Sequence, residues 1–390
     1  MTANCNAGSW IGRHVETGRP IEVKVADGIV QAIVEAPESP ELPWLSAGWI
    51  DLQVNGCNGG DFNGDRTDAE DLVTATRYLW SKGVTRYLPT VITGSFERMD
   101  RAMRTIALAC EREPDIGASI GGIHMEGPYI SDITGPRGAH SVVHVRKPDI
   151  REFDVMQKSA GGRIALVTLA PELEGAEAFI RHAHRSGVIV SIGHSSANAD
   201  QIAAAATAGA TMSTHLGNGS HLTLPRHPNY IWDQLADDRL YAGLIADGHH
   251  LPTATLKTML RAKGDKAFLV SDCVDLAGLP PGVYGSEIGG QVVLREDGRL
   301  YMQDNPGILA GSASTLETGI RILVGTLGYS LADAVALVTE RPAEAMGWSG
   351  LGRLEPGGPG SLTLFECEEG TAEVRIVETV VEGRTVYARQ

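Results

Sequence analysis

Eight short apolar segments alternate with helix-like segments through the middle of the chain, and this alternation limits the possible folds more than any other feature. The segments are WIDLQV, TRYLPTVIT, IGGIHME, RIALVTLA, VIVSIGH, ATMSTHL, YAGLIAD and AFLVSD. Helix-like segments such as DAEDLVTATRYLWSKG and GAEAFIRHAHRSG lie between most of them and end in Gly, a residue favoured just after a helix. Eight strand–helix repeats predict a (β/α)8 barrel. A doubly wound open sheet is the structural alternative. Its nucleotide-binding version is disfavoured because no G-x-G-x-x-G follows the first strand and no Walker A motif occurs.

The two ends of the chain show a different pattern. Residues 20–35 alternate apolar and polar side chains around an Asp27-Gly28 turn, which is a hairpin signal. Residues 361–389 contain three strand-like runs separated by turns. We therefore expect residues 1–46 and 353–390 to form one small β-sandwich domain, and residues 47–352 to form the barrel. The 390 residues suit this division, because a barrel of this kind takes about 250 residues or somewhat more.

The charge of the chain excludes some classes of partner. A net charge of −15 and a pI near 5.2 argue against nucleic-acid and membrane-surface partners, which require basic patches. The sequence contains no run of about 18 apolar residues, so we expect no membrane span. The opening MTANCNAGSW lacks the pattern of a secretory signal. The five cysteines (Cys5, Cys57, Cys110, Cys273 and Cys367) are scattered, with no CxxC pair. This favours a reducing, cytoplasmic setting over a disulfide framework.

Acidic and histidine side chains follow five of the predicted strands: Glu126, His194, His215, Asp247 and Asp272. Active sites of barrel enzymes lie at the carboxyl ends of the strands, so we expect these groups to converge. Glu126, His194 and His215 offer one oxygen and two nitrogen ligands, a set that suits Zn²⁺ with a fourth position open to water. Asp272 then suits the base that takes a proton from water and returns it to a leaving amine.

Two further histidines, His140 and His250, are candidate hydrogen-bond donors to an oxyanion or to the substrate. Each polar residue also has a purely structural interpretation. A single histidine at a strand end is more often a hydrogen-bonded structural residue, and His124, which shares a strand face with Glu126, fits that description. His182 and His184 lie on a predicted helix and are expected at the surface. Five such residues at the same end of a barrel favour a catalytic metal site.

The first predicted strand raises a question about the number of metals. Many metal-dependent hydrolases end this strand in His-x-His, whereas Gln53 and Asn55 occupy the corresponding positions here. Both side chains are poor ligands for Zn²⁺.

A set of short motifs, taken in order along the chain, resembles the N-acetylglucosamine-6-phosphate deacetylases of the amidohydrolase superfamily. The motifs are DLQVNG, HMEGPY, GAH, GHS, THLGN, ADGHHL, SD and LAGSAST. The resemblance runs from about residue 45 to about residue 350 and extends to the divided β domain. No single motif is specific, but the set is.

The resemblance implies roles for individual residues. Glu126, His194 and His215 would be the metal ligands and Asp272 the catalytic acid/base. The family positions that contact substrate match Ala139, His140, Asn218, Gly219, Asp247, Gly248, His249, His250, Leu309, Ala310 and Gly311. Arg226 matches an arginine that reaches the substrate phosphate of a neighbouring subunit, which implies a homodimer with a shared active site. Family members with Gln-x-Asn in the first strand use a single metal, so Gln53 and Asn55 imply one divalent ion per subunit. Zn²⁺ is the first expectation, with Fe²⁺, Co²⁺ or Mn²⁺ as alternatives.

The sequence departs from the family pattern around the substrate. Gly217 replaces an aromatic residue, His227 and Asn229 replace Glu and Gly, and the loop before His140 carries two extra residues. The leading interpretation is a metal-dependent hydrolase that removes acetyl from an N-acetylated amino sugar, foremost N-acetylglucosamine 6-phosphate. One alternative is the same chemistry on another N-acyl compound or a cyclic amide, since Arg226 could also bind a carboxylate. Another is a non-catalytic metal- or sugar-binding barrel, against which Asp272 argues.

Overall fold

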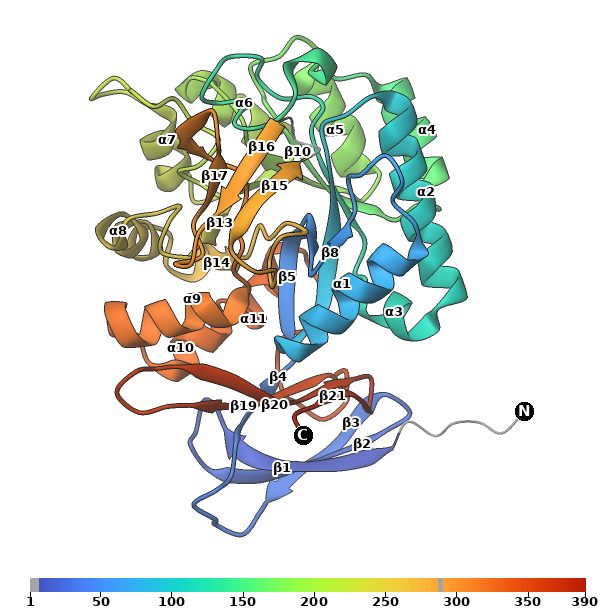
Figure 1. Cartoon of the computed structure of the whole chain (residues 1–390), viewed down its shortest axis with the longest axis vertical. Coiled ribbons are helices and arrows are strands. Elements are labelled where there is room, and N and C mark those ends of the chain that lie inside the picture. Colours follow the sequence, from blue (N-terminus) through green and yellow to red (C-terminus); the bar gives the residue numbers. More distant parts are fainter. Residues whose placement is uncertain (1–6, 287–289) are drawn as a thin grey trace.

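The computed structural model describes residues 7–286 and 290–390, which form a parallel barrel and a second sheet built from both ends of the chain (Figure 1). The eight barrel strands lie in the order β14-β13-β12-β11-β10-β9-β8-β5, which follows the order of the chain. The first and last strands close the ring, because the Asp272 N–H donates to the Gln53 carbonyl at 3.0 Å and the Asn55 N–H donates to the Cys273 carbonyl at 2.7 Å. The predicted (β/α)8 barrel is confirmed.

All eight predicted strands are present. Their bounds are β5 (Trp49–Val54), β8 (Val84–Ile92), β9 (Ile123–Glu126), β10 (Ile164–Leu169), β11 (Ile189–Ile192), β12 (Ala210–Ser213), β13 (Tyr241–Ile245) and β14 (Ala267–Val270). The helices that follow them are α1 (Ala69–Ser81), α2 (Phe96–Arg112), α4 (Ile150–Ser159), α5 (Ala176–Arg185), α6 (Ala199–Ala208), α7 (Tyr230–Ala236), α8 (Thr253–Lys263) and α9 (Leu316–Ile322). Shorter elements are β6 (Gly56–Cys57), β7 (Gly60–Asp61), α3 (Pro114–Ser119), η1 (Val142–His144), η2 (Gly264–Lys266), η3 (Leu323–Leu327), α10 (Leu331–Ala336) and α11 (Glu340–Ala345).

Local sequence signals explain where the helices begin. Helix α1 starts after Asp68, whose carboxylate accepts the N–H groups of Glu70 and Asp71, while the Asp71 carboxylate accepts the N–H of Asp68. Helix α6 starts with the same reciprocal arrangement between Asn198 and Gln201. Each capping box satisfies N–H groups that the first turn of a helix leaves without partners.

The barrel has two apolar cores. The larger lies between the strands and the surrounding helices, where Trp49, Tyr87, Phe153 and Phe179 are fully buried. The smaller core contains inward-facing strand residues and is sealed by α11 and the segment after it. Its main members are Ile50, Leu52, Leu88, Leu166, Met212, Ile245, Phe268, Val270, Ala343 and Met346. Helix α11 and the segment after it close the end of the barrel where the strands begin. The polar groups of the strands can therefore gather at the opposite end.

The second sheet joins strands from both termini in the order β21-β20-β19-β4-β1-β2-β3. Their bounds are β1 (Gly8–His14), β2 (Pro20–Ala26), β3 (Ile29–Glu35), β4 (Trp44–Ala47), β19 (Leu362–Cys367), β20 (Val374–Val381) and β21 (Arg384–Ala388). In Figure 1 the strands from the C-terminus face those from the N-terminus, and apolar residues of both fill the space between. The Asp27-Gly28 turn has φ values of 54° and 75°, as a two-residue hairpin turn requires. The divided β domain is thus present, while its boundaries at 46/47 and 352/353 stay a prediction.

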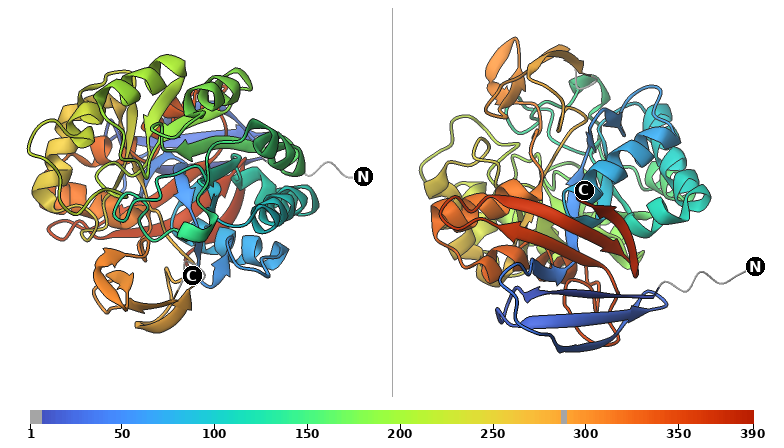
Figure 2. Two further views of the ribbon diagram at one scale, coloured as in Figure 1. Left: turned by 90° about the horizontal axis from the view of Figure 1, so that it is seen from above. Right: turned by 60° about the horizontal axis from the view of Figure 1, so that its bottom comes forward.

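A four-stranded antiparallel sheet is inserted between β14 and α9, and the sequence analysis did not predict it. We call this sheet, together with the turn between β16 and β17, the flap. Its strands are β15 (Gly282–Ser286), β16 (Gly290–Leu294), β17 (Leu300–Met302) and β18 (Asn305–Leu309). The flap has its own small core, which includes Val292, Leu294 and Leu300. In both views of Figure 2 these strands, drawn in orange, project from the rim of the barrel.

Cys57, Cys110, Cys273 and Cys367 are free thiols, and Cys5 lies outside the described residues. Within residues 7–286 and 290–390, no helix has the length and apolar character needed to cross a bilayer.

Candidate active site

Three buried side chains meet at the carboxyl ends of neighbouring barrel strands. Glu126 is the last residue of β9, and His194 and His215 follow β11 and β12. The Glu126 Oε1 atom lies 3.2 Å from His194 Nε2 and 3.0 Å from His215 Nε2, and the two Nε2 atoms are 3.1 Å apart. A tetrahedral zinc site with bonds of about 2.0 to 2.1 Å places its ligand atoms roughly 3.3 Å apart. The three atoms therefore have the spacing of three corners of such a site.

The surroundings of the two histidines support this interpretation. His194 Nδ1 lies 2.9 Å from the carbonyl oxygen of Pro136, so Nδ1 carries the proton and the lone pair of Nε2 faces the centre. The Nε2 atom of His215 faces the same centre, and its Nδ1 atom is buried without a partner among the described residues. Two imidazole nitrogens 3.1 Å apart beside a carboxylate need a proton or a cation between them, and a divalent ion satisfies all three groups.

The backbone at these positions is itself unusual. His194, His215 and Asp272 have φ values of 50°, 30° and 52°, in the left-handed region that residues other than Gly rarely adopt. Such conformations cost on the order of 1 to 3 kcal/mol each and are concentrated at functional sites. Their occurrence just after three parallel strands turns all three side chains toward the mouth of the barrel.

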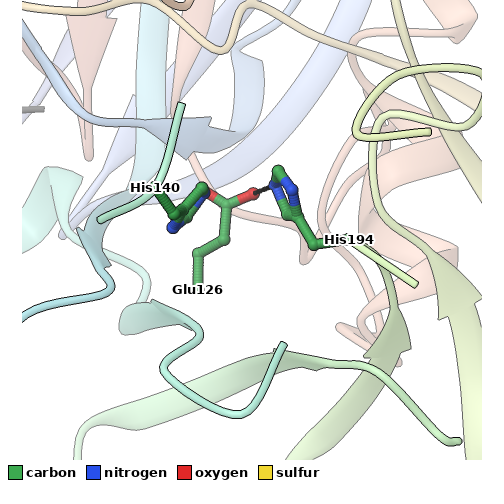
Figure 3. Close-up of side chains that lie close together, drawn as sticks. All are labelled: Glu126, His140 and His194. Atoms are coloured by element: carbon green, nitrogen blue, oxygen red, sulfur yellow. Dashed lines mark hydrogen bonds and ion pairs between the residues drawn. The ribbon is translucent and has the colours of Figure 1, made fainter. Parts of the chain in front are cut away.

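His140 faces the same centre from the loop after β9. Glu126, His140 and His194 each place a ligand atom within 4.8 Å of the others (Figure 3). Burial, together with the neighbouring His194, lowers the pKa of His140 to about 3, so its ring is neutral at physiological pH. Its Nδ1 atom lies 2.9 Å from Thr93 Oγ1. If Nδ1 accepts from this hydroxyl, Nε2–H is a donor toward the centre; the other tautomer would offer a lone pair instead.

Gln53 and Asn55 support the acidic groups of the site. Gln53 Nε2 donates to Glu126 Oε1 at 2.9 Å, and Asn55 Nδ2 donates to Asp272 Oδ1 at 2.8 Å. Burial and then the charge of Glu126 raise the pKa of Asp272 to about 6. Burial would also raise the pKa of Glu126, but its close contacts with the His194 and His215 side chains outweigh burial and hold this pKa well below the ordinary value. Asp272 thus differs from Glu126 in being close to the pKa that proton transfer near neutral pH requires.

These groups open into a cavity of about 890 Å³, large enough for a small-molecule substrate. Most residues that the sequence analysis selected line it: Glu126, Ala139, His140, His194, His215, Asn218, Gly219, Gly248, His249, His250, Asp272, Leu309 and Gly311. The other three lie outside its lining. Ala310 is buried in the flap core, and Arg226 is exposed on the loop before α7. Asp247 accepts the N–H groups of His249 and His250 at 2.8 and 2.9 Å and pairs with His250 Nδ1 at 2.7 Å, so it shapes the loop after β13.

The sequence analysis did not select several residues of the cavity wall. The flap contributes Asp297, Arg299, Asn305, Gly307 and Ile308, and the loop after β12 contributes His221, Leu222 and Thr223. One signal for the flap was present in the sequence: QVVLREDGRLYM has apolar runs on both sides of an Asp-Gly turn, as in the hairpin at Asp27-Gly28. No comparable local signal marks the loop after β12.

Comparison with known proteins agrees with this geometry. The model of the amidohydrolase family matches residues 44–386. An N-acetylgalactosamine-6-phosphate deacetylase from Escherichia coli O157:H7 is 32% identical over 361 residues, 92% of each chain. An N-acetylglucosamine-6-phosphate deacetylase from Haemophilus influenzae is 30% identical over 343 residues, 87% of this chain and 86% of the relative.

A solved structure extends the likeness to three dimensions. It is a mutant N-acetyl-D-glucosamine-6-phosphate deacetylase from Mycobacterium smegmatis in complex with N-acetyl-D-glucosamine-6-phosphate. It superposes with a TM-score of 0.85 at 25% identity and covers 97% of this chain and 99% of that one. The barrel, the buried Glu-His-His group and these relatives together show that the chain belongs to the amidohydrolase family, among the N-acetylglucosamine-6-phosphate deacetylases.

Proposed function

We propose that this protein hydrolyses the acetamide of an N-acetylated hexosamine 6-phosphate, foremost N-acetylglucosamine 6-phosphate, releasing acetate and the free amine. The observation that carries the proposal is that Asp272, with its raised pKa, shares one cavity with the triangle of Glu126, His194 and His215. A binding protein needs no acid/base beside a metal site. Relatives of this chain bear the names of both the glucosamine and the galactosamine enzyme, so the two epimers are the substrates to compare.

In the proposed mechanism Glu126, His194 and His215 hold one divalent cation, with Zn²⁺ first and Fe²⁺, Co²⁺ or Mn²⁺ as alternatives. When bound, such an ion supplies a Lewis acid that lowers the pKa of water and polarises a carbonyl. Asp272, held by Asn55, takes a proton from the attacking water and passes it to the leaving nitrogen. The neutral His140 donates through Nε2–H to the carbonyl oxygen as negative charge develops there.

A panel of substrates tests this function. We expect acetate release from N-acetylglucosamine 6-phosphate or its galactosamine epimer to exceed release from the unphosphorylated sugars and from N-acetyl amino acids. We also expect release to require a divalent metal. Acetate should be measured with and without added Zn²⁺ after chelation. If the protein prefers an N-acyl amino acid or a cyclic amide, the proposed hydrolase chemistry stands, but the sugar phosphate is not its substrate.

We also propose that two chains associate as a homodimer. Arg226 is exposed and outside the cavity of its own chain. The same segment exposes apolar side chains, with Leu222 77% and Trp232 50% exposed, as expected of a surface that a second copy covers. Light scattering should give about twice the 41.4 kDa chain mass. A monomer that turns over the phosphosugar would contradict the proposal.

We also propose that the protein is located in the cytoplasm. This location is supported by the free thiols of Cys57, Cys110, Cys273 and Cys367, which suit a reducing compartment. Recovery of the native protein from an oxidising compartment by cell fractionation would contradict it.

A further inference from the structure

Four buried polar side chains form a continuous chain of hydrogen bonds across the inside of the barrel. They come from β9, β10 and β11 and from the residue after β12, and we call them the polar layer: His124, Thr168, Ser191 and Thr214. His124 Nε2 lies 2.7 Å from Thr168 Oγ1. Thr214 Oγ1 lies 2.6 Å from both Thr168 Oγ1 and Ser191 Oγ. A hydroxyl can donate one hydrogen bond and accept others, so the chain is unbroken from β9 to β12.

The polar layer occupies positions that apolar side chains could also fill. Leu166 and Met212, each two residues before a threonine of the layer, belong to the smaller apolar core. Burying hydroxyl and imidazole groups costs free energy that their hydrogen bonds only offset, and an apolar replacement of the same shape can be as stable. The hydrogen bonds add direction, because they fix the rotamers and the spacing of the side chains that they join. We therefore looked for what the layer holds in place.

The backbone of His194 rests on the polar layer. Gly193 directly precedes His194, and a Cβ atom at Gly193 would lie 2.6 Å from Thr168 Cγ2 and 2.8 Å from Thr214 Cβ. Carbon atoms that are not bonded stay roughly 3.5 to 4.0 Å apart, so only Gly fits against the two threonines. His194 has a left-handed φ of 50°, a costly conformation that persists only where the surroundings enforce it.

The other two groups of the ligand triangle also adjoin the layer. Thr214 directly precedes His215, whose φ is 30°. Thr168 is the register partner of Glu126 between β10 and β9, and the Thr168 carbonyl accepts the N–H of Gly127 at 3.1 Å. A change in the layer therefore reaches all three ligands, although neither threonine belongs to the triangle or to the cavity lining.

We propose that Thr168 is a positioning residue for the metal site, because its hydroxyl bonds to His124 and Thr214 hold the three ligands at their spacing. The ligand atoms lie 3.0 to 3.2 Å apart, and metal–ligand bonds of about 2.0 to 2.1 Å tolerate little change in that spacing. The role rests on the metal site of the proposed function and requires no contact with metal or substrate.

The test uses two opposite substitutions of Thr168. Thr168→Val keeps the shape of the side chain and removes the hydroxyl that His124 and Thr214 share. We expect its zinc affinity to fall about tenfold, the low end of the loss when a group that supports a ligand is removed. Thr168→Ser keeps the hydroxyl and loses a methyl group, so its zinc affinity should stay close to that of the wild type. Competition between the purified protein and a chromophoric chelator measures these affinities.

Thr76→Val is the matched control. Thr76 is as fully buried as Thr168, but it lies between α1 and β8, where its hydroxyl donates to the Leu72 carbonyl at 2.6 Å and lies 2.7 Å from Tyr87 Oη. In saturating Zn²⁺, Thr76→Val and Thr168→Val should lower the midpoint of thermal unfolding by comparable amounts, because each leaves a buried partner without its hydrogen bond. Only Thr168→Val should weaken zinc binding.

If Thr168→Val does not fold, Ser191→Ala takes its place, since it removes only the last bond of the layer and should weaken zinc binding by a smaller factor. Unchanged zinc affinity in the variant that folds would overturn the proposal. An equal loss in Thr76→Val or Thr168→Ser would also overturn it, because either result would indicate general destabilisation.

The experiment also separates this role from the proposed function. If the wild-type protein binds zinc but releases no acetate from hexosamine phosphates, the proposed function fails, and a selective loss of zinc affinity in Thr168→Val would still support the positioning role. A wild-type protein that binds no zinc would overturn the positioning role together with the metal site.

Discussion

Asp272→Asn is expected to lower turnover by on the order of 10² or more while leaving the metal in place, because a positioned acid/base contributes that much and Asn cannot take a proton. Asn has nearly the same size as Asp, and its side-chain oxygen still accepts the hydrogen bond that Asn55 Nδ2 donates at 2.8 Å. Asp272 is not one of the three groups in the Glu126, His194 and His215 triangle, so the ligand set stays complete. Steady-state kinetics and metal analysis of the same preparation check both parts of the prediction.

Asn55→Leu provides the matched control for Asp272→Asn. It removes the hydrogen bond to Asp272 but keeps the carboxylate, so we expect a smaller loss of turnover than in Asp272→Asn. Near-normal turnover in Asp272→Asn would show that another residue transfers the proton. Loss of metal along with activity would show that Asp272 is a metal ligand.

The second large effect is expected for His215→Ala, which removes one corner of the triangle. The wild-type protein, purified without chelators, should contain about one equivalent of divalent metal. Loss of a residue that only supports a ligand costs about 10- to 100-fold in metal affinity, and loss of a direct ligand should cost more. Activity should fall with metal content and should recover in part when excess Zn²⁺ is added. Elemental analysis and a Zn²⁺ titration measure both quantities.

Two variants serve as controls for His215→Ala. His182 of α5 pairs at the protein surface with Asp154 of α4, so His182→Ala should keep metal and activity. Gln53→Leu removes the donor that lies 2.9 Å from Glu126 Oε1, and it should weaken metal binding without abolishing it. Two equivalents of metal in the wild-type protein, with the second lost in Gln53→Leu, would contradict the single-metal site.

The barrel could be predicted from the sequence because its signals are local. Each of the eight strands, from β5 to β14, is a short apolar run, and helices such as α1 and α6 begin at capping residues only a few positions away. Convergence of Glu126, His194, His215 and Asp272 then follows from topology, since parallel strands in a closed ring end at one mouth. Their chemical roles stay predictions, but their meeting in one cavity is now observed.

The remaining features depend on contacts between segments far apart in the chain. The sequence shows that Gln53 and Asn55 are poor ligands, but only the folded structure shows that they donate to Glu126 and Asp272, 73 and 217 residues away. The flap contains a hairpin signal, yet only the folded structure shows that His249 donates to the Asp297 carbonyl of its β16–β17 turn, 48 residues away. Local pattern therefore determined the strands and the polar strand ends. Only the tertiary structure decided that Arg299, and not Arg226, faces the cavity of the same chain, because the position of a surface segment depends on the groups that it meets after folding.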